Sequence, residues 1–448
     1  MTRSAVPGDR IVVVGASLAG LRTAEALRGQ GFEGELVLIG DEPHEPYDRP
    51  PLSKTVLCGW LSTDQVLLPR IRDLDARWLL GIAATGLNLA ERVVRLADGR
   101  RIGFDQVVIA TGARARPWPV AAEAALSGVH LLRGRDDADA LRADLVTGPG
   151  RVLVIGGGFT GSEVASSCHD LGFPVTVTQR GAAPMAGALG SVVGAAIGRR
   201  QLAAGIDLRL NTTVLAMEGD TAGRLRRARL SDGTVLDVDV AVVASGSLRN
   251  VEWLRGSGLA AGARGVVCDA ACRALDAEGA VVEGVYAAGD VARWRHPRFD
   301  TDLVSFEHWG NALDQAETVA HNLIHGPALP RYNEALPAFW SDQFGLNIKS
   351  VGLLSVADQV VLTQGSFDKG PFVAAYGRQG VTVGAVAVNS PRVLDGYAAL
   401  VAERAPFPPA INAPDQPAQA QPTDVGFPRP AAHIDQPATL VSAHKGQS

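Results

Sequence analysis

Two glycine-rich turns carry the clearest chemical signal in the sequence. The first is Gly15-Ala16-Ser17-Leu18-Ala19-Gly20, and the second is Gly156-Gly157-Gly158-Phe159-Thr160-Gly161. Turns of this spacing between a strand and a helix present backbone N–H groups to the pyrophosphate of a dinucleotide. In the first turn a serine replaces the middle glycine, but its side chain is small enough to crowd the phosphate only slightly. The pattern predicts two dinucleotide sites in one chain.

The residues that follow each turn indicate how the adenosine ribose is bound. An acid about twenty positions on accepts hydrogen bonds from the ribose hydroxyls, and Glu42 fits this position, with Asp41 as the second choice. After the second turn, Gln179 and Arg180 stand where the acid is expected. An amide and a guanidinium can bind the 2′-phosphate of NADPH, although Arg180 can equally be an ordinary surface arginine. NADH and NADPH therefore both stay open at the second site.

Strands and helices of fitting pattern surround both turns. The βαβ units are predicted at 10–14, 21–27 and 35–39, and again at 151–155, 163–171 and 174–178. Two further apolar runs, 106–110 and 238–244, each stop at a tight turn. Each is expected to close one nucleotide-binding domain.

Composition excludes several classes of protein. With 448 residues, 46% hydrophobic and 20% charged, the chain can build two or three domains with ordinary cores. A net charge of -5 argues against general nucleic-acid binding. The sequence has neither a long uncharged apolar stretch nor a signal-peptide pattern, so we expect a cytoplasmic protein with no membrane contact. Its four cysteines, Cys58, Cys168, Cys268 and Cys272, form no CxxC pair and no zinc pattern, so buried free thiols and no metal are expected.

Four further segments occur in a fixed order along the chain. They are Pro46-Tyr47-Asp48-Arg49-Pro50-Pro51-Leu52-Ser53-Lys54, Ala110-Thr111-Gly112, Tyr286-Ala287-Ala288-Gly289-Asp290 and Phe339-Trp340-Ser341-Asp342-Gln343. Glu307-His308-Trp309 and Asn311-Ala312 extend the set. With these motifs the chain, over about residues 8 to 400, resembles the FAD-dependent NAD(P)H:ferredoxin reductases of the putidaredoxin reductase and biphenyl dioxygenase ferredoxin reductase type.

The resemblance implies an α/β, glutathione-reductase-like fold with two Rossmann-type nucleotide-binding domains and a C-terminal α+β domain. The expected divisions are an FAD-binding domain at 8–115 and 245–330, an NAD(P)-binding domain at 116–244 and a C-terminal domain at 331–405. In the last of these, apolar runs at 373–376 and 381–388 predict a hairpin. Residues 406–448 are rich in Pro, Ala and Gln and are expected to form a disordered tail.

The resemblance also assigns cofactor-binding residues. For FAD it implies Gly15, Ser17, Gly20, Glu42, Arg49, Lys54, Thr111, Gly112, Asp290 and Trp309. For NAD(P)H the second glycine turn and the strand after it indicate Gly156, Gly158, Gly161, Gln179 and Arg180, and Gly246 completes the set. Arg49 and Lys54 would lie along the flavin, Asp290 would bind the ribityl or pyrophosphate end, and the backbone of Trp309 would contact the pyrimidine edge.

Three residues are implied to act at the reacting ring. Lys54 would stabilise the negative charge that collects at N1 and C2=O of a reduced flavin. Glu163 would be its carboxylate partner, and the alternative is an acid that only stabilises a helix N-terminus. Trp340 would pack against the flavin, and the alternative is a core tryptophan.

By resemblance, hydride passes from NAD(P)H to FAD, and single electrons then pass to a ferredoxin that supplies a cytochrome P450 or a ring-hydroxylating oxygenase. The lack of a redox cysteine pair implies that electrons leave the flavin directly. Arg293, Arg295 and Arg298 are candidate docking residues for an acidic ferredoxin, and an exposed solvated loop is the alternative. A monomer or weak dimer is expected.

Other functions stay open at this stage. A redox-sensing NAD(P)H-binding flavoprotein like apoptosis-inducing factor, an NADH oxidase or a rubredoxin reductase would share the flavin motifs. The chain departs from the family pattern at Gln179, Gly187 and Arg249. These departures put the choice between NADH and NADPH in doubt and leave the flavin set untouched.

Overall fold

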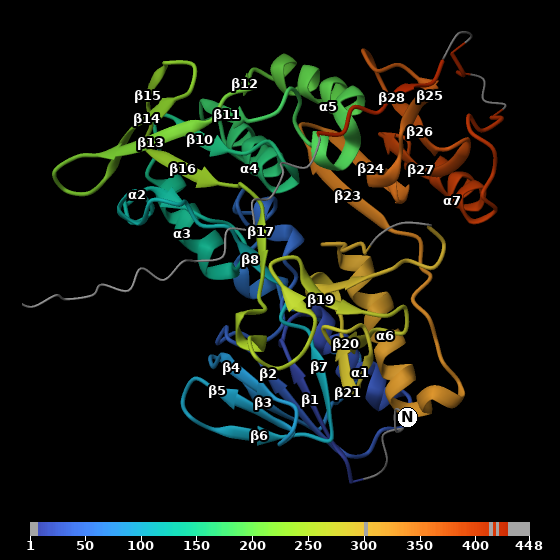
Figure 1. The fold of residues 1–448 in the computed structure, drawn as a ribbon. Coiled ribbons are helices and arrows are strands. Elements are labelled where there is room, and N and C mark those ends of the chain that lie inside the picture. The colour runs from blue at the N-terminus through green and yellow to red at the C-terminus, as the bar shows by residue number, and fades with distance from the viewer. Residues whose placement is uncertain (1–7, 300–302, 412–414, 418–420, 429–448) are drawn as a thin grey trace, which may run out of the picture.

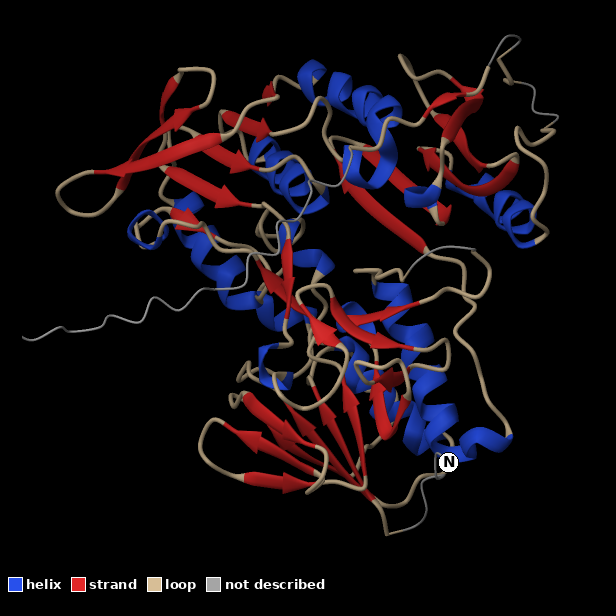
Figure 2. Ribbon diagram, viewed as in Figure 1, coloured by secondary structure: helices blue, strands red, loops and turns tan. Residues whose placement is uncertain are grey.

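The computed structural model describes residues 8–299, 303–411, 415–417 and 421–428. Three large sheets organise this part of the chain, and helices pack against each (Figures 1 and 2). In Figure 1 the first sheet lies in the lower half, and the second and third lie side by side above it. This arrangement agrees with the α/β class predicted from the sequence.

The first sheet contains the first βαβ unit and has the strand order β18-β19-β20-β21-β7-β1-β2-β3, with β22 paired to β19. Strands β21, β7, β1, β2 and β3 run parallel, and most of their apolar residues are buried because helices or a second layer cover both faces. Helices α1 (Leu18–Gly29) and α6 (Trp309–His325) pack against one face, and a small sheet of β4 (Ala84–Asn88), β5 (Val93–Leu96) and β6 (Arg101–Gly103) covers the other. The strands are β1 (Arg10–Val14), β2 (Glu35–Ile39), β3 (Ala76–Leu79), β7 (Gln106–Ile109), β18 (Ala261–Gly262), β19 (Gly265–Cys268), β20 (Arg273–Leu275), β21 (Val281–Ala287) and β22 (Ala292–Trp294).

The second sheet contains the second βαβ unit and is parallel throughout, in the order β12-β11-β10-β16-β9. Its strands are β9 (Val129–His130), β10 (Val152–Ile155), β11 (Val175–Gln179), β12 (Asp207–Leu210) and β16 (Val240–Val243). The helices of this region are α2 (Ala121–Ala124), α3 (Arg135–Val146), α4 (Phe159–Asp170) and α5 (Ala186–Ala203). A three-stranded antiparallel sheet of β13 (Val214–Gly219), β14 (Leu225–Leu230) and β15 (Val235–Asp237) shares a core with one of its faces.

The third sheet is antiparallel and lies at the C-terminal end, in the order β23-β24-β27-β26-β25-β28. Its strands are β23 (Ala338–Gln343), β24 (Leu346–Gly352), β25 (Gln359–Gly365), β26 (Phe372–Arg378), β27 (Val381–Val388) and β28 (Thr423–Asp424). Strands β26 and β27 form the predicted hairpin. One face packs against α7 (Leu394–Ala402), and the other shares a core with α5.

The chain passes between the first and second sheets twice. The two crossings, β8 (Ala113–Ala115) and β17 (Ser247–Arg249), pair with each other as antiparallel strands. This pairing holds the carboxyl ends of the two parallel sheets close together.

The expected start of the disordered tail at 406 is wrong for the residues that the structure describes. The ring of Phe407 packs on Gly377, and Val425, which is 3% exposed, joins the core between the third sheet and α5. Strand β28 extends the edge of the third sheet beside β25. A few large apolar side chains within a Pro-rich segment supply this packing, and average composition hides them. Residues 429–448 lie outside the described part.

Candidate functional site

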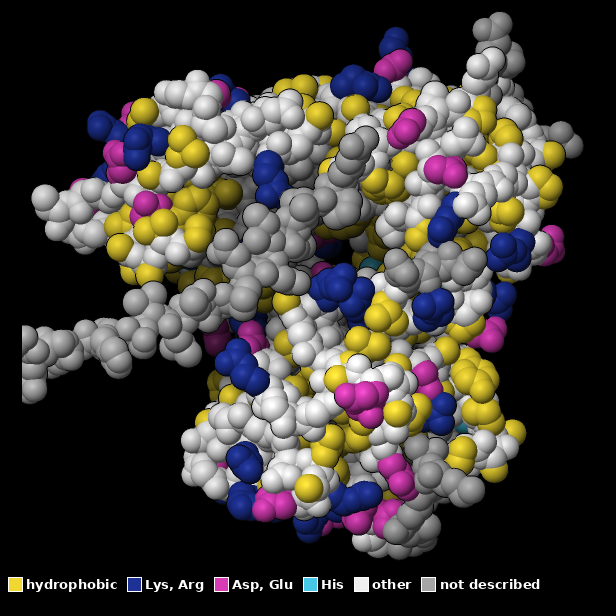
Figure 3. Space-filling view, in the orientation of Figure 1, with side chains coloured by type: hydrophobic (Ala, Val, Ile, Leu, Met, Phe, Trp, Pro, Cys, Tyr) yellow, Lys and Arg dark blue, Asp and Glu magenta, His cyan; other side chains and the backbone are white. Residues whose placement is uncertain are grey.

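A large cavity lies where the first and second sheets meet. Its volume is about 910 Å³, and residues from the first glycine turn, from α4 and from β23 line it. The space-filling view shows a hollow at this junction (Figure 3). Parallel sheets place functional residues at the carboxyl ends of their strands, which is where this cavity opens.

The first glycine turn forms one end of the cavity. A Cβ on Gly15 would lie 2.0 Å from the Ala110 carbonyl oxygen, and one on Gly20 would lie 1.9 Å from the Gly15 oxygen. Only glycine fits at these two positions. Ser17 is the N-cap of α1, and its side chain makes no capping hydrogen bond. The positive end of α1 is therefore available to an anionic group.

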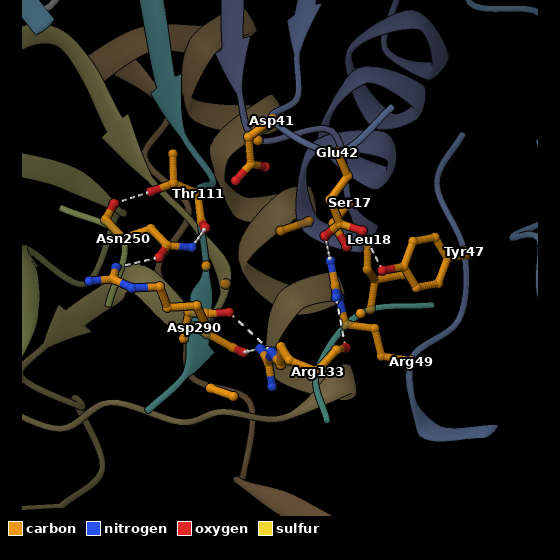
Figure 4. Close-up of a pocket in the computed structure, with 18 of the residues that line it drawn as sticks. Ser17, Leu18, Asp41, Glu42, Tyr47, Arg49, Thr111, Arg133, Asn250 and Asp290 are labelled. Carbon is orange, nitrogen blue, oxygen red and sulfur yellow. Dashed lines mark hydrogen bonds and ion pairs between the residues drawn. The ribbon is translucent and has the colours of Figure 1, made fainter. Parts of the chain in front are cut away.

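Glu42 is held beside this turn by two partners (Figure 4). Arg49 Nη2 donates to its Oε1 at 2.5 Å, and the Tyr47 hydroxyl donates to Oε2. Burial alone would raise the pKa of Glu42, but Arg49 and Tyr47 together bring it below its usual value. The carboxylate stays ionised, as a ribose-binding acid must be. Arg49 lies at this end of the cavity, paired with Glu42, and Asp41 also lines the wall.

Arg133 is a binding candidate that sequence reasoning missed. Its Nη2 lies 2.5 Å from Asp290 Oδ2, its Nε donates to the Ala113 carbonyl at 3.0 Å, and its own carbonyl accepts from Arg49 (Figure 4). Arg133 lies between β9 and α3, so it reaches the cavity from the second sheet. No local motif marks it, since its position depends on how the two sheets meet.

Thr111 and Gly112 lie where β7 ends, and Asn250 secures them. Thr111 Oγ1 donates to the Asn250 carbonyl at 2.7 Å, and Asn250 Nδ2 donates back to the Thr111 carbonyl at 2.8 Å (Figure 4). Gly112 has a φ of 61° and accepts from the Asn250 N–H. This exchange ties the end of β7 to the segment after β17.

Lys54 and Glu163 meet inside the cavity. Lys54 follows the short helix Pro50–Ser53, and Glu163 lies in the second turn of α4. Lys54 Nζ is 2.6 Å from Glu163 Oε2, and the two side chains are only 20% and 10% exposed. Ser53 Oγ donates to the same oxygen at 2.6 Å, and Ser341 Oγ donates to Oε1 at 2.7 Å. Both serines lie within motifs quoted above, yet sequence alone gave neither a role.

Aromatic side chains form the wall near this ion pair. Trp340 is 37% exposed. The centroid of its ring lies 4.7 Å from that of the His308 ring and 6.2 Å from that of the Trp309 ring. Burial lowers the pKa of His308 to about 4, so this imidazole is neutral at pH 7. Trp309 Nε1 donates to Asp48 Oδ1 at 3.1 Å.

Helix α6 begins at this wall. His308 is its N-cap, and the imidazole Nδ1 accepts from the Gly310 N–H at 3.3 Å. Trp309 and Ala312 line the cavity, so the positive end of the helix dipole faces it. The positive end of α6 and the Lys54 ammonium therefore both border the cavity.

The second glycine turn lies at the start of α4. A Cβ on Gly156 would lie 2.4 Å from the Ala244 carbonyl oxygen, and one on Gly161 would lie 1.9 Å from the Gly156 oxygen. Gly158 has no heavy atom within 4 Å of its Cβ position, which leaves room for a phosphate to approach. Gly246, with a φ of 105°, comes directly before β17, where the chain passes back from the second sheet to the first.

Gln179 ends β11 and turns back onto this glycine turn. Its Oε1 accepts from the Gly157 N–H at 3.0 Å, so its amide NH₂ faces Gly181. Arg180 is exposed and makes no hydrogen bond or ion pair with another residue of the described segments. Both side chains therefore offer donors beside the second site.

The three candidate docking arginines differ in environment. Arg293 is half-buried in β22, Arg298 donates to Glu334 Oε2 at 3.3 Å, and Arg295 is exposed. They do not form a uniform exposed cluster, because Arg293 is half-buried and Arg298 already has an acidic partner.

The chemistry of the residues that line the cavity fits FAD. The cavity offers a helix N-terminus for a pyrophosphate, a held carboxylate for a ribose and a lysine where a ring of growing negative charge would lie. The second turn offers a helix N-terminus whose middle glycine leaves the approach open. In the segments described, no group of His, Cys, Asp and Glu could hold a metal ion, and no helix is long and apolar enough to span a membrane.

Two family models match the chain. One, described as pyridine nucleotide-disulphide oxidoreductase, matches residues 9–316. The other, described as reductase C-terminal, matches residues 338–419 and so extends past the expected domain end at 405.

Curated relatives and a solved structure match over nearly the same length. The ferredoxin reductase component of chlorobenzene dioxygenase from Cupriavidus sp. (strain PS12) is 35% identical over 89% of this chain and 94% of its own length. Putidaredoxin reductase of Pseudomonas putida is 34% identical over 90% of this chain and 94% of its own. The crystal structure of the covalent putidaredoxin reductase–putidaredoxin complex superposes with a TM-score of 0.83 at 31% identity, covering 90% of this chain and 94% of that one. The resemblance and the fold class inferred from the sequence are confirmed.

Proposed function

Because the chain belongs to the pyridine nucleotide-disulphide oxidoreductase family, we propose that it is an FAD-dependent NAD(P)H:ferredoxin reductase. In this function, hydride from NAD(P)H reduces FAD, and single electrons leave for an iron–sulfur ferredoxin. That ferredoxin supplies a cytochrome P450 or a ring-hydroxylating oxygenase, as the relatives named for dioxygenase and putidaredoxin systems indicate.

One observation carries this proposal. A single cavity joins the first glycine turn and Glu42 to the Lys54–Glu163 pair and then to Trp340. A bound dinucleotide would lie with its pyrophosphate at the turn and its ring at the ion pair. The second glycine turn opens onto the same junction through α4, which carries Glu163.

The chain's own residues prepare this junction for hydride transfer. When bound, FAD accepts a hydride and releases electrons singly. Lys54 would place a positive charge at the ring, and Glu163 holds the ammonium in position through a charge-assisted hydrogen bond. The start of α6 would add a partial positive charge in the same cavity. These positive charges favour the electron-rich form of the ring.

Electrons leave by a route that needs no protein thiol. All four cysteines are free, and burial raises the pKa of Cys168 to about 12, so this thiol is held protonated. Trp340 lies in the cavity wall and is 37% exposed, and we assign it the covering of the ring on the exit side. Free cysteines also suit a reducing compartment, so we place the reaction in the cytoplasm.

Turnover with a panel of acceptors tests the proposed function. NADH- and NADPH-dependent reduction should be measured with several ferredoxins, a rubredoxin and O₂ as acceptors. We expect at least one ferredoxin to be reduced far faster than O₂ or rubredoxin. If every acceptor is slow and the flavin forms a long-lived complex with the nucleotide, a redox-sensing role would replace the proposal.

A further inference from the structure

Glu163 is held by side chains from separate parts of the chain. Lys54 and Ser53, in the loop region after β2, donate to its Oε2, each at 2.6 Å. Ser341, on β23 of the third sheet, donates to its Oε1 at 2.7 Å. The proposed function gives Lys54 and Glu163 a task, and Ser341 so far has none.

The direction of the Ser341 hydrogen bond follows from its neighbours. Gln343 Nε2 donates to Ser341 Oγ at 3.0 Å, and Gln343 Oε1 accepts from Gln201 Nε2 at 3.3 Å. The amide of Gln343 is thus oriented from both sides. Because an ionised carboxylate only accepts, the hydroxyl proton of Ser341 points to Glu163. The serine and both glutamines are at most 3% exposed, so water does not compete for these bonds.

Strand β23 is fixed against α4 on either side of this hydrogen bond. The ring centroids of Phe339 and Phe159 lie 4.7 Å apart, and the Phe344 N–H donates to Ser166 Oγ at 2.7 Å. Ser341 lies between these two contacts and is 0% exposed. The hydroxyl is therefore presented to the carboxylate from a rigid support.

The same strand carries Trp340. Successive side chains of a strand point to opposite faces, so Trp340 lines the cavity while Ser341 points into the protein. One strand of the third sheet thus contacts both the cavity wall and the carboxylate that holds Lys54.

We infer that Ser341 is a positioning residue for hydride transfer, acting through Glu163. Its hydroxyl donates to Oε1 and so holds the carboxylate with Oε2 facing the Lys54 ammonium. A carboxylate free to rotate about its Cγ–Cδ bond would lose this arrangement. The third sheet thereby takes part in the reduction of the flavin as well as in covering it. The inference rests on the proposed function, because Lys54 has to act at the ring.

A mutant cycle in the FAD-loaded protein tests this role. Stopped-flow loss of flavin absorbance at saturating nucleotide should be measured for S341A, E163Q and the double variant. We expect S341A to lower the limiting rate about tenfold, the cost of one hydrogen bond to a charged group, with the nucleotide dissociation constant changed by less than about twofold. S341T, which keeps the hydroxyl, should restore the rate to within about threefold of the original.

Ser350 provides a matched control. It lies on the neighbouring strand β24 and is 4% exposed, and its hydroxyl has no hydrogen-bond partner among the described residues. S350A removes the same atom from the same sheet, so we expect an unchanged limiting rate. If S341A fails to retain FAD, S341C replaces it in the cycle, and the same loss is expected because a thiol is a weaker donor.

The cycle separates positioning through Glu163 from a merely structural role. In the E163Q background, S341A should change the limiting rate by less than about twofold, and the unfolding temperatures of the four proteins should show the same non-additivity. A full tenfold loss in that background, or an unchanged rate in S341A alone, would overturn the inference. These rates involve no ferredoxin, so a failure of the proposed acceptor would leave the cycle readable.

Discussion

Lys54 and Glu163 are the residues on which the proposed chemistry depends most. They lie 109 positions apart in the sequence: Lys54 follows the short helix Pro50–Ser53, and Glu163 lies on α4, directly after the second glycine turn. Ser53 and Ser341 also donate to Glu163, so three side chains hold this carboxylate. Lys54 is therefore positioned by a hydrogen-bond network that includes Ser341.

Replacing Lys54 tests the charge at the ring. Lys54→Ala removes the positive charge that would stabilise the reduced ring, and we expect the limiting rate of flavin reduction to fall by roughly 100-fold while FAD stays bound. Stopped-flow absorbance gives the rate, and the absorption spectrum of the purified protein gives the FAD content. Lys369→Ala, at an exposed lysine, is the control and should keep the original rate. An original rate in Lys54→Ala would contradict the role assigned to this lysine.

Gln179 is expected to influence the choice of nucleotide. A glutamate there could keep the Gly157 hydrogen bond with one oxygen and accept from ribose hydroxyls with the other, while it repels a 2′-phosphate. We expect Gln179→Glu to shift the ratio of kcat/KM for NADH over NADPH upward by roughly 10- to 100-fold. Gln359→Glu, at an exposed glutamine on β25, should leave the ratio unchanged. The same ratio in both variants would remove Gln179 from the nucleotide site.

Among the elements, α5 and the C-terminal segment depend on one another. Helix α5 is interrupted at Gly190, which has a φ of 75°, and the Ser191 N–H donates to the Val425 carbonyl at 3.0 Å. A Cβ on Gly190 would lie 2.4 Å from that carbonyl oxygen, so only glycine admits the segment here. The N-terminal part of α5 follows Met185, whose N–H donates to the Gly157 carbonyl in the second glycine turn. The C-terminal segment thus supports the helix that borders the nucleotide site.

A charge at position 425 should release this segment. Val425→Asp removes the burial of a valine, worth about 1.5 to 3 kcal/mol, and places a carboxylate in an apolar core. We expect the unfolding temperature, measured by calorimetry, to fall by roughly 5 °C or more. Val235→Asp makes the same change at a valine that is 54% exposed, and we expect a shift of about 1 °C or less. Equal shifts in the two variants would mean that residue 425 is not buried in solution.

Local patterns of the sequence were sufficient to predict the βαβ units. The strand predicted at 10–14 matches β1, and the hairpin around 377–380 matches β26 and β27, because periodicity and glycine turns are local signals. Arg133 and Asn250 could not be predicted in this way, since each acts across the meeting of two sheets. The contact of Val425 was missed because composition averaged over a long segment does not reveal a single buried side chain.

At the scale of the whole molecule, the site exists only where three sheets meet. Lys54 lies in the segment after β2 of the first sheet, Glu163 lies on α4 beside the second sheet, and Ser341 and Trp340 lie on β23 of the third. The fold brings the two glycine turns to a common junction, which suits the transfer of a hydride between two dinucleotides. Of the candidate docking arginines, Arg295 is exposed and Arg298 is exposed but paired with Glu334, so a ferredoxin contact at this cluster would rest mainly on Arg295.

Sequential-mixing stopped flow tests the central claim most directly. The protein is first mixed with NADH or NADPH, and the reduced protein is then mixed with an oxidised ferredoxin under anaerobic conditions. We expect one nucleotide to bleach the flavin within the time of a single turnover and the ferredoxin to restore its absorbance, with two ferredoxins reduced for each nucleotide because a hydride carries two electrons. A flavin that stays oxidised with both nucleotides, or a reduced protein that no ferredoxin reoxidises, would contradict the account.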